Sequence, residues 1–358
     1  MQKIFIVTGG AGFIGANFLN YMVKKYPEIL FINIDKLTYA GNLENLKPIE
    51  NEKNYLFIKG DIANKQFIEN VFKKYPPNVI INFAAESHVD KSILDPENFI
   101  MTNIYGTYSL LENARKVWKN NDGLFIHIST DEVYGSLGEE GYFYEDTPYA
   151  PNSPYSASKA SADFLVRAYY KTYNLPAIIT NCSNNYGPYQ FPEKLIPLMI
   201  INALNSKPLP VYGDGKNVRD WLFVLDHCKA IELVIFKGKP GEKYNIGGNN
   251  EWKNIDIVKK ICVILQEKKE KGELKNFKNL PEKFENLIKF VKDRPGHDRR
   301  YAICSEKIQK ELGWKPETDF ETGLRYTIDW YINNMDWVKN VISGDYLKYY
   351  EKWYGDRL

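Results

Sequence analysis

Cysteine is scarce in this chain of 358 residues, and the four cysteines are widely separated: Cys182, Cys228, Cys262 and Cys304. They form no Cys-x-x-Cys pair, and no histidine cluster accompanies them. Structural zinc sites need closely spaced Cys and His ligands, and disulfide frameworks occur mainly in small, cysteine-rich secreted domains. We therefore expect buried free thiols and no metal site.

An excess of charge of either sign is also absent, because 47 Lys and Arg residues face 45 Asp and Glu residues, for a net charge of +2. Nucleic-acid binding usually brings a strongly basic surface, so we expect no nucleic-acid partner. A local basic site for a small phosphorylated molecule remains compatible with this balance.

Long apolar runs are missing as well, and none could span a bilayer. The first residues form no charged segment followed by an apolar segment and a cleavage site. We therefore expect a cytoplasmic protein with no membrane association.

Hydrophobic residues make up 44% of the chain, which is enough for a sizeable core. In the first half, short β-rich runs alternate with segments whose apolar residues recur at three- and four-residue spacing, a pattern typical of a parallel sheet covered by helices on both faces. The expected strands are 3–8, 29–35, 55–59, 79–83, 124–129 and 177–181, and the expected helices are 13–25, 65–74, 97–118 and 155–173.

After about residue 181 this rhythm breaks into segments punctuated by glycine and proline, with helices expected near 196–204 and 226–236. We therefore predict an α/β protein whose residues 1–181 mainly form a doubly wound parallel sheet of the Rossmann type. Residues 182–358 are expected to form mainly a smaller substrate-binding lobe, with segments that cross back to the sheet.

Three glycines lie between the first expected strand and the first expected helix: Gly9, Gly12 and Gly15. This spacing allows a tight turn, a close approach of a pyrophosphate and close helix packing, with the helix N-terminus facing the phosphates. Asp35 ends the second strand, where a carboxylate can bind the adenosine ribose and would repel a 2′-phosphate, so NAD is favoured over NADP. Asp61 follows the third strand and is a weaker candidate for the adenine edge, because such an Asp is also common in turns.

Tyr155 and Lys159 are four residues apart on one expected helix, so the ammonium can lie near the phenol and favour the phenolate. The pair follows Ser129 and Thr130 at an expected strand end. A hydroxyl, a tyrosine and a lysine in a dinucleotide-binding fold are the parts needed to oxidise an alcohol.

Asp131 and Glu132 directly follow Thr130, and simple alcohol oxidation has no task for them. Two adjacent carboxyl groups indicate an additional acid/base elimination, with one group neutral and the other ionised. The alternative is a turn that these acids merely cap.

The glycine spacing and the Tyr155-x-x-x-Lys159 pair resemble the extended short-chain dehydrogenase/reductase superfamily. Further segments resemble its nucleotide-sugar branch, and specifically the dTDP-glucose 4,6-dehydratase family: Ala84-Ala-Glu-Ser-His-Val-Asp90, Ser129-Thr-Asp-Glu-Val-Tyr-Gly135, Asn181-Cys-Ser-Asn-Asn-Tyr-Gly-Pro188, Pro192-Glu-Lys-Leu-Ile-Pro197, Arg219-Asp-Trp221 and Asp293-Arg-Pro-Gly-His-Asp-Arg-Arg-Tyr301. The resemblance runs from residue 8 to beyond residue 300.

The resemblance implies a lyase that converts dTDP-glucose to a 4-keto-6-deoxy sugar in three steps. Tyr155 takes the C4 hydroxyl proton while NAD⁺ accepts the C4 hydride, and Thr130 holds the same oxygen. Glu132 then removes the C5 proton while Asp131 protonates the departing C6 hydroxyl. Return of the hydride to C6 restores NAD⁺.

The resemblance also implies the binding residues. For the cofactor they are Gly9, Gly12, Phe13, Ile14, Gly15, Asp35, Lys36, Leu37, Thr38, Asp61, Ile62, Phe83, Ala84, Ala85, Glu86, Ser87, Thr102, Tyr155, Lys159 and Asn185. For the nucleotide sugar they are Ser87, Thr130, Asn184, Lys194, Leu195, Pro210, Val211, Tyr212, Arg219, Asn254, Arg294 and His297. Arg219 and Arg294 rank first as pyrophosphate ligands because a guanidinium matches phosphate oxygens, with surface ion pairing as the alternative.

A homodimer through the helices near 103–118 and 155–173 is a further implication of the resemblance. Two positions depart from the family pattern, with Lys91 in place of the usual arginine and Cys304 in place of the frequent aspartate. Neither Lys91 nor Cys304 belongs to the acid/base set. These departures therefore put only local packing or salt bridges in doubt, and the expected reaction class is unchanged.

Three other functions compete with this prediction. A nucleotide-sugar 4-epimerase uses the same tyrosine and lysine but has no task for Asp131 and Glu132. A dehydratase of another nucleotide hexose, such as GDP-mannose, shares the chemistry, but the GDP-mannose enzyme is expected to favour NADP, which Asp35 opposes. A non-catalytic NAD-binding protein would not need the intact catalytic set.

Overall fold

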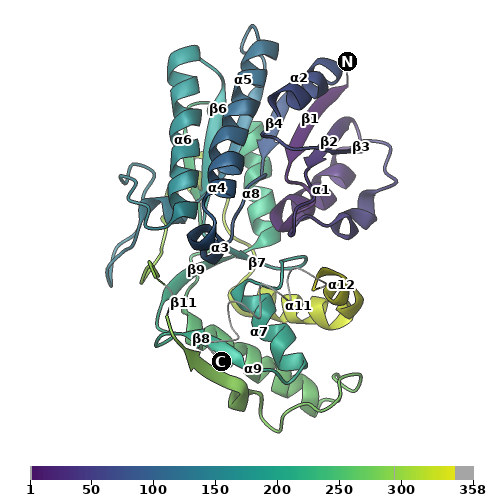
Figure 1. The fold of residues 1–358 in the computed structure, drawn as a ribbon, viewed down its shortest axis with the longest axis vertical. Coiled ribbons are helices and arrows are strands. Elements are labelled where there is room, and N and C mark those ends of the chain that lie inside the picture. The colour runs from purple at the N-terminus through teal and green to yellow at the C-terminus, as the bar shows by residue number, and fades with distance from the viewer. Residues whose placement is uncertain (1, 294, 343–358) are drawn as a thin grey trace.

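A seven-stranded parallel sheet forms the centre of the fold in a computed structural model that describes residues 2–293 and 295–342 (Figure 1). Its strands follow the order β10-β6-β5-β4-β1-β2-β3. This is the order of a classic dinucleotide-binding sheet with one strand added, so the predicted doubly wound fold is confirmed. The strands are β1 (Lys3–Thr8), β2 (Ile29–Asp35), β3 (Tyr55–Lys59), β4 (Val79–Asn82), β5 (Leu124–Thr130), β6 (Ala177–Cys182) and β10 (Lys243–Ile246).

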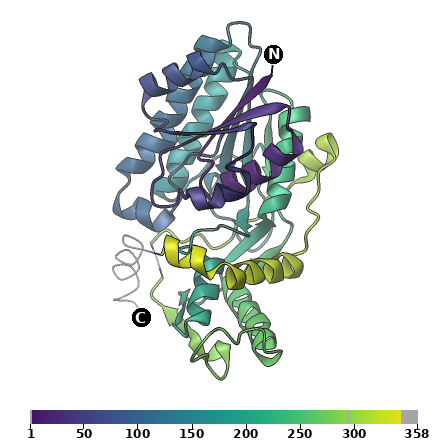
Figure 2. The ribbon, with the colours of Figure 1, turned by 90° about the vertical axis from the view of Figure 1, so that its right-hand side faces the viewer.

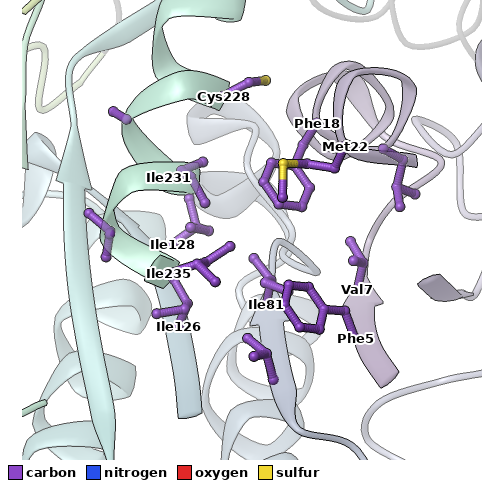
Figure 3. Close-up of a cluster of buried hydrophobic side chains, with 14 of the residues drawn as sticks. Phe5, Val7, Phe18, Met22, Ile81, Ile126, Ile128, Cys228, Ile231 and Ile235 are labelled. Atoms are coloured by element: carbon purple, nitrogen blue, oxygen red, sulfur yellow. The ribbon is translucent and has the colours of Figure 1, made fainter. Parts of the chain in front are cut away.

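Helices cover both faces of this sheet because its strands are apolar on both sides. Phe5 and Val7 of β1 point to one face, and Ile6 between them points to the other. The first face packs against α1 (Phe13–Lys25) and α8 (Val224–Lys237), and Figure 3 shows Phe18 and Ile231 from these helices meeting over the strands. The second face packs against α2 (Lys65–Lys74), α5 (Thr107–Val117) and α6 (Pro154–Tyr173).

A second, smaller core forms below the carboxyl edge of the sheet (Figures 1 and 2). Its strands are β7 (Asn184–Tyr186), β8 (Leu209–Tyr212), β9 (Val218–Phe223), β11 (Glu251–Lys253) and β12 (Ile288–Val291). Its helical segments are α7 (Leu195–Leu204), α9 (Asn254–Glu270), η4 (Phe284–Leu287), α11 (Phe320–Asn333) and α12 (Met335–Val341).

Several segments beyond residue 181 return to the main sheet. Strand β10 pairs in parallel with β6, helix α8 packs on the first face, and α10 (Glu306–Leu312) lies against both. The boundary at residue 181 stays a prediction.

The predicted helix 97–118 is confirmed as an unbroken helical stretch from residue 97 to residue 117, but its hydrogen-bonding pattern changes along its length. It divides into α4 (Glu97–Phe99), a π-helical turn η2 (Ile100–Gly106) and α5, following α3 (Val89–Leu94). In the wide turn, the side chain of Asn103 accepts from the amide of Glu86 at 2.9 Å and donates to its carbonyl at 3.0 Å. These contacts come from a distant loop, which helical spacing in the sequence does not reveal.

Residues 2–293 and 295–342 include no helix that is long and apolar enough to cross a membrane, and no group of three His, Cys, Asp or Glu residues that could hold a metal ion. All four cysteines are free, and Cys304 alone among them is only half-buried. The cytoplasmic location stays a prediction.

Candidate active site

The glycine turn after β1 leaves the N-terminus of α1 open. Gly9 has a φ of +71°, and a Cβ there would lie 2.5 Å from the amide nitrogen of Ala84. A Cβ on Gly15 would lie 2.4 Å from the carbonyl oxygen of Gly9, whereas one on Gly12 would meet nothing closer than that same oxygen at 3.3 Å. No side chain caps α1, so its first amides remain available to an anion such as a pyrophosphate.

Asp35 holds this turn in place from the end of β2. One carboxylate oxygen accepts from the amide of Ala11 at 2.9 Å and the other from the amide of Leu37 at 2.8 Å. Burial raises the pKa of Asp35, and the two amides oppose that shift. Each oxygen keeps a lone pair that a ribose hydroxyl could use. Nearby, Lys36 pairs with Asp61 at 2.7 Å.

One pocket collects most of the predicted residues, at the carboxyl edge of the sheet. All five predicted catalytic residues line it, as do all predicted cofactor residues except Leu37. Of the predicted substrate residues, the wall includes Ser87, Thr130, Asn184 and Lys194.

Thr130, the last residue of β5, starts the short helical turn η3 (Asp131–Tyr134). Its hydroxyl accepts from the amide of Glu132 at 3.3 Å and donates to one carboxyl oxygen of Asp131 at 3.3 Å. Asp131 is 1% exposed, and its other carboxyl oxygen has no hydrogen-bond partner among the described residues. The turn therefore buries a carboxyl group that lines the pocket and leaves one of its oxygens without a hydrogen-bond partner among the described residues.

The two adjacent acids are electrostatically different. Burial, followed by the charges of Glu132 and Asp220, raises the pKa of Asp131 well above its ordinary value. Glu132 is only half-buried, and its charge also raises the pKa of Tyr155 and Tyr301. Burial and the neighbouring charges thus favour the neutral form of Asp131.

Tyr155 and Lys159 lie on the first turns of α6, which begins with a capping box between Ser153 and Ser156. The ammonium of Lys159 donates to the carbonyl of Ile128 at 2.7 Å, and burial lowers its pKa to about 8. Burial, and then Glu132, raises the pKa of Tyr155 well above its ordinary value. The expected phenolate is therefore not favoured in the protein alone, because burial is the largest influence on the phenol and raises its pKa.

Most of the remaining predicted substrate residues lie outside the pocket wall, on the smaller lobe: Leu195, Pro210, Val211, Tyr212, Arg219, Asn254 and His297. Tyr212 donates to Asp90 at 3.3 Å, which joins β8 to α3 across the two parts of the molecule. His297 contacts Asp293 at 2.6 Å. Arg294 lies outside the described residues.

Arg219 is 5% exposed and is held by the backbone and one aromatic ring. Its guanidinium donates to the carbonyls of Val218 at 2.8 Å and Asp298 at 2.9 Å, and it lies 4.2 Å from the ring centre of Tyr301. Its charge also acts to lower the pKa of Asp131. The guanidinium group of Arg219 is therefore held in place close to the acid pair.

Two residues around the site had no role in the sequence-based prediction. Glu193 lines the pocket, accepts from Tyr39 at 2.9 Å and pairs with Lys91 at 3.1 Å, so the unusual lysine has a buried partner. Asp163 lies behind the pocket, one turn beyond Lys159. Glu193 lies in the motif Pro192-Glu-Lys-Leu-Ile-Pro197, so a role for it could have been predicted from the sequence. Asp163 lies in a helical segment without such a motif, so its role could not have been predicted.

Comparison with known proteins agrees with this geometry. The model of the family described as GDP-mannose 4,6 dehydratase matches residues 6–327. A dTDP-glucose 4,6-dehydratase from Xanthomonas campestris pv. campestris (strain B100) is 54% identical over 348 residues, which is 96% of this chain and 97% of the relative.

Two solved structures carry the same name. The dTDP-glucose 4,6-dehydratase of Bacillus anthracis, in complex with NAD, is 51% identical with a TM-score of 0.84, covering 95% of this chain and 99% of that one. The enzyme of Streptomyces venezuelae, also with NAD bound, is 42% identical with a TM-score of 0.86, covering 94% and 99%. Identity at this level over nearly the full length places this chain in the dTDP-glucose 4,6-dehydratase family.

Proposed function

We propose that this chain is an NAD-dependent hydro-lyase that converts dTDP-glucose to dTDP-4-keto-6-deoxyglucose. The observation that carries the proposal is the acid pair at the end of β5, where burial raises the pKa of Asp131 well above its ordinary value while its neighbour Glu132 is only half-buried. Elimination of water needs one group that gives a proton and one that takes a proton. Oxidation of an alcohol alone needs neither.

The residues around the glycine turn fit NAD. The open N-terminus of α1 suits the pyrophosphate, and Asp35, fixed by two backbone amides, suits the adenosine ribose and disfavours a 2′-phosphate. NAD supplies the acceptor for the C4 hydride in the first step and the donor of that hydride in the last.

Tyr155 is the base for the first step. Thr130 lines the same pocket, so both groups can hold the C4 oxygen of the sugar. Receiving the hydroxyl proton requires the phenolate, which burial disfavours in the protein alone. The positive charge of Lys159 is therefore expected to favour the Tyr155 phenolate mainly when substrate is bound in the site.

Glu132 and Asp131 carry out the second step. The 4-ketone acidifies the C5–H bond, and the Glu132 carboxylate takes that proton. The C6 hydroxyl leaves as water with a proton from Asp131, whose unpaired carboxyl oxygen is the candidate donor. Return of a proton to C5 by Glu132 completes the 4-keto-6-deoxy sugar.

Arg219 is proposed to bind the pyrophosphate of the nucleotide sugar, together with Arg294. The fixed guanidinium of Arg219 near the acid pair supports this role, since a planar fork matches phosphate oxygens. The residues on β8 and the segment around His297 are proposed to hold the nucleotide.

A homodimer is also proposed, and an exposed apolar surface supports it. The surface comprises Ile100, Met101 and Tyr105 on η2 and Phe164 on α6, which are 39–59% exposed. The two elements pack against each other, so these side chains can form one continuous patch. A second copy of the chain would cover it.

The test of the proposed reaction is incubation with dTDP-glucose and NAD⁺ followed by mass analysis of the product. We expect loss of one water with no net reduction of NAD⁺. An unchanged mass with galactose formed would assign the chain to the 4-epimerases instead, and turnover of only UDP- or GDP-sugars would reassign the substrate.

A further inference from the structure

A buried polar cluster lies behind the pocket, between β5, β6 and α6. Its centre is Asp163, which is 1% exposed and one helical turn beyond Lys159. Residues four apart on a helix share a face, so the carboxyl group of Asp163 and the ammonium of Lys159 lie on the same side of α6.

Three side-chain donors converge on one carboxyl oxygen of Asp163. The hydroxyl of Ser129 donates at 2.9 Å, the phenol of Tyr149 at 2.8 Å and the amide of Asn181 at 3.4 Å. Burial raises the pKa of Asp163, whereas the charge of Lys159 and then the hydrogen bonds from Tyr149 and Ser129 oppose that shift and favour the ionised carboxylate.

The second carboxyl oxygen of Asp163 faces Nε2 of His127 at 3.4 Å. The tautomer of this histidine follows from its neighbours. Thr107 donates to the carbonyl of Asn103 at 2.7 Å, so it accepts from the amide of Asn82, which also lies 3.3 Å from Nδ1 of His127. Nδ1 is therefore the acceptor and the neutral ring carries its proton on Nε2, which lies near Asp163 but forms no hydrogen bond with it.

The groups that face Asp163 come from several elements. They are Lys159 on α6, His127 on β5, Lys243 on β10, Tyr134 on η3 and Tyr149 ahead of α6. Burial lowers the pKa of His127 well below its ordinary value, so this ring is neutral. The two lysines are the positive charges of the cluster.

Lys159 is almost fully buried, which disfavours its charged form. Asp163 first, and then the Cys182 thiol, act in the opposite direction. Burial raises the pKa of that thiol to about 12, so Cys182 is uncharged at neutral pH. Among the described residues, Asp163 is then the anion that opposes the burial of Lys159.

We propose that Asp163 is a positioning residue of the reaction, a buried carboxylate that keeps the Lys159 ammonium charged beside Tyr155. The effect of Asp163 on the reaction rests on the proposed function, because the charge of Lys159 is needed only if the Tyr155 phenol must lose a proton. The effect of Asp163 on the protonation of Lys159 does not depend on that function.

The test follows the titration of Lys159 by NMR of protein labelled with ¹³C at the lysine Cε, with Lys159→Arg to assign the signal. In the unmutated protein we expect the ammonium at pH 7 and loss of its proton near pH 8. Asp163→Asn should move that titration down by at least about one pH unit and move the alkaline limit of kcat with it. An unchanged titration in this variant would overturn the proposal.

Tyr149→Phe is the matched control, because it removes a hydrogen bond to the same carboxylate without removing a charge. It should leave the titration of Lys159 nearly unchanged, and a shift as large as that of Asp163→Asn would mean that cluster integrity, and not charge, is what matters. The unmutated protein also gives a test that needs no variant, since a neutral Lys159 at pH 7 would contradict the proposal. The NMR result stands whether or not dTDP-glucose is dehydrated, so the two proposals fail separately.

Discussion

The ammonium of Lys159 reaches across from α6 to donate a 2.7 Å hydrogen bond to the carbonyl of Ile128 in β5. This contact ties the helix that carries Tyr155 to the strand that ends in Thr130 and the acid pair. The lysine therefore has a mechanical role as well as an electrostatic one, because it ties the proposed base for C4 to the strand that carries the groups proposed to act at C5 and C6.

Tyr155→Phe tests the assignment of the base. Removal of a positioned general base should lower kcat by roughly 10²- to 10⁴-fold with little change in NAD binding. Steady-state rates and titration with NAD measure the two effects. Tyr244→Phe is the control, since this buried phenol lies on β10 outside the pocket wall and its loss should leave kcat unchanged.

Gly12→Ala and Gly15→Ala separate binding from folding at the glycine turn. A Cβ at Gly15 would strike the carbonyl of Gly9 at 2.4 Å, so that variant should lose both thermal stability and NAD affinity. A Cβ at Gly12 meets only the same oxygen at 3.3 Å, so the fold should tolerate it while the pyrophosphate loses its close approach. Melting curves with and without NAD distinguish the two, and equal melting temperatures of both variants would count against this reading.

Arg219→Met tests the pyrophosphate site. Loss of a charge-assisted contact should raise KM for dTDP-glucose roughly 10- to 100-fold, equivalent to about 1.5–3 kcal/mol, and should lower kcat much less. The melting temperature should also fall, because the guanidinium holds the carbonyls of Val218 and Asp298. Arg299→Met, which breaks only an exposed ion pair with Asp214, is the control for nonspecific charge loss. A fall in kcat at constant KM for Arg219→Met would argue against a binding role.

Phe164→Glu tests the dimer. A charge within the apolar patch on η2 and α6 should shift the protein toward monomer in light scattering. Phe290→Glu on β12 is a matched control, because Phe290 is 60% exposed and Phe164 is 59% exposed, yet Phe290 lies far from the patch in sequence and on the smaller core. A monomeric unmutated protein would refute the dimer outright.

The sequence predicted β1, β2 and β3 to the residue, because the strands of a helix-covered parallel sheet are short apolar runs bounded by turn residues. The sequence also predicted that one site contains Thr130, Asp131, Glu132, Tyr155 and Lys159, and all five line one pocket. Their motifs lie at strand and helix ends that must meet at one edge of a parallel sheet.

Contacts between segments that are far apart in the sequence could not be predicted from such patterns. The π-helical turn depends on Asn103 meeting Glu86, and the raised pKa of Tyr155 depends on how deeply the phenol is buried. The role of Asp163 depends on donors from β5, β6 and the segment before α6. Helical spacing places Asp163 beside Lys159 but does not reveal that both are enclosed.

The double variant Asp131→Asn with Glu132→Gln tests the central claim most directly, with reduced cofactor followed by absorbance and product by mass. The account predicts that C4 oxidation persists in part, so that reduced nicotinamide accumulates on the protein while no water is lost from the sugar. Full turnover to the 4-keto-6-deoxy product by this variant would contradict the account.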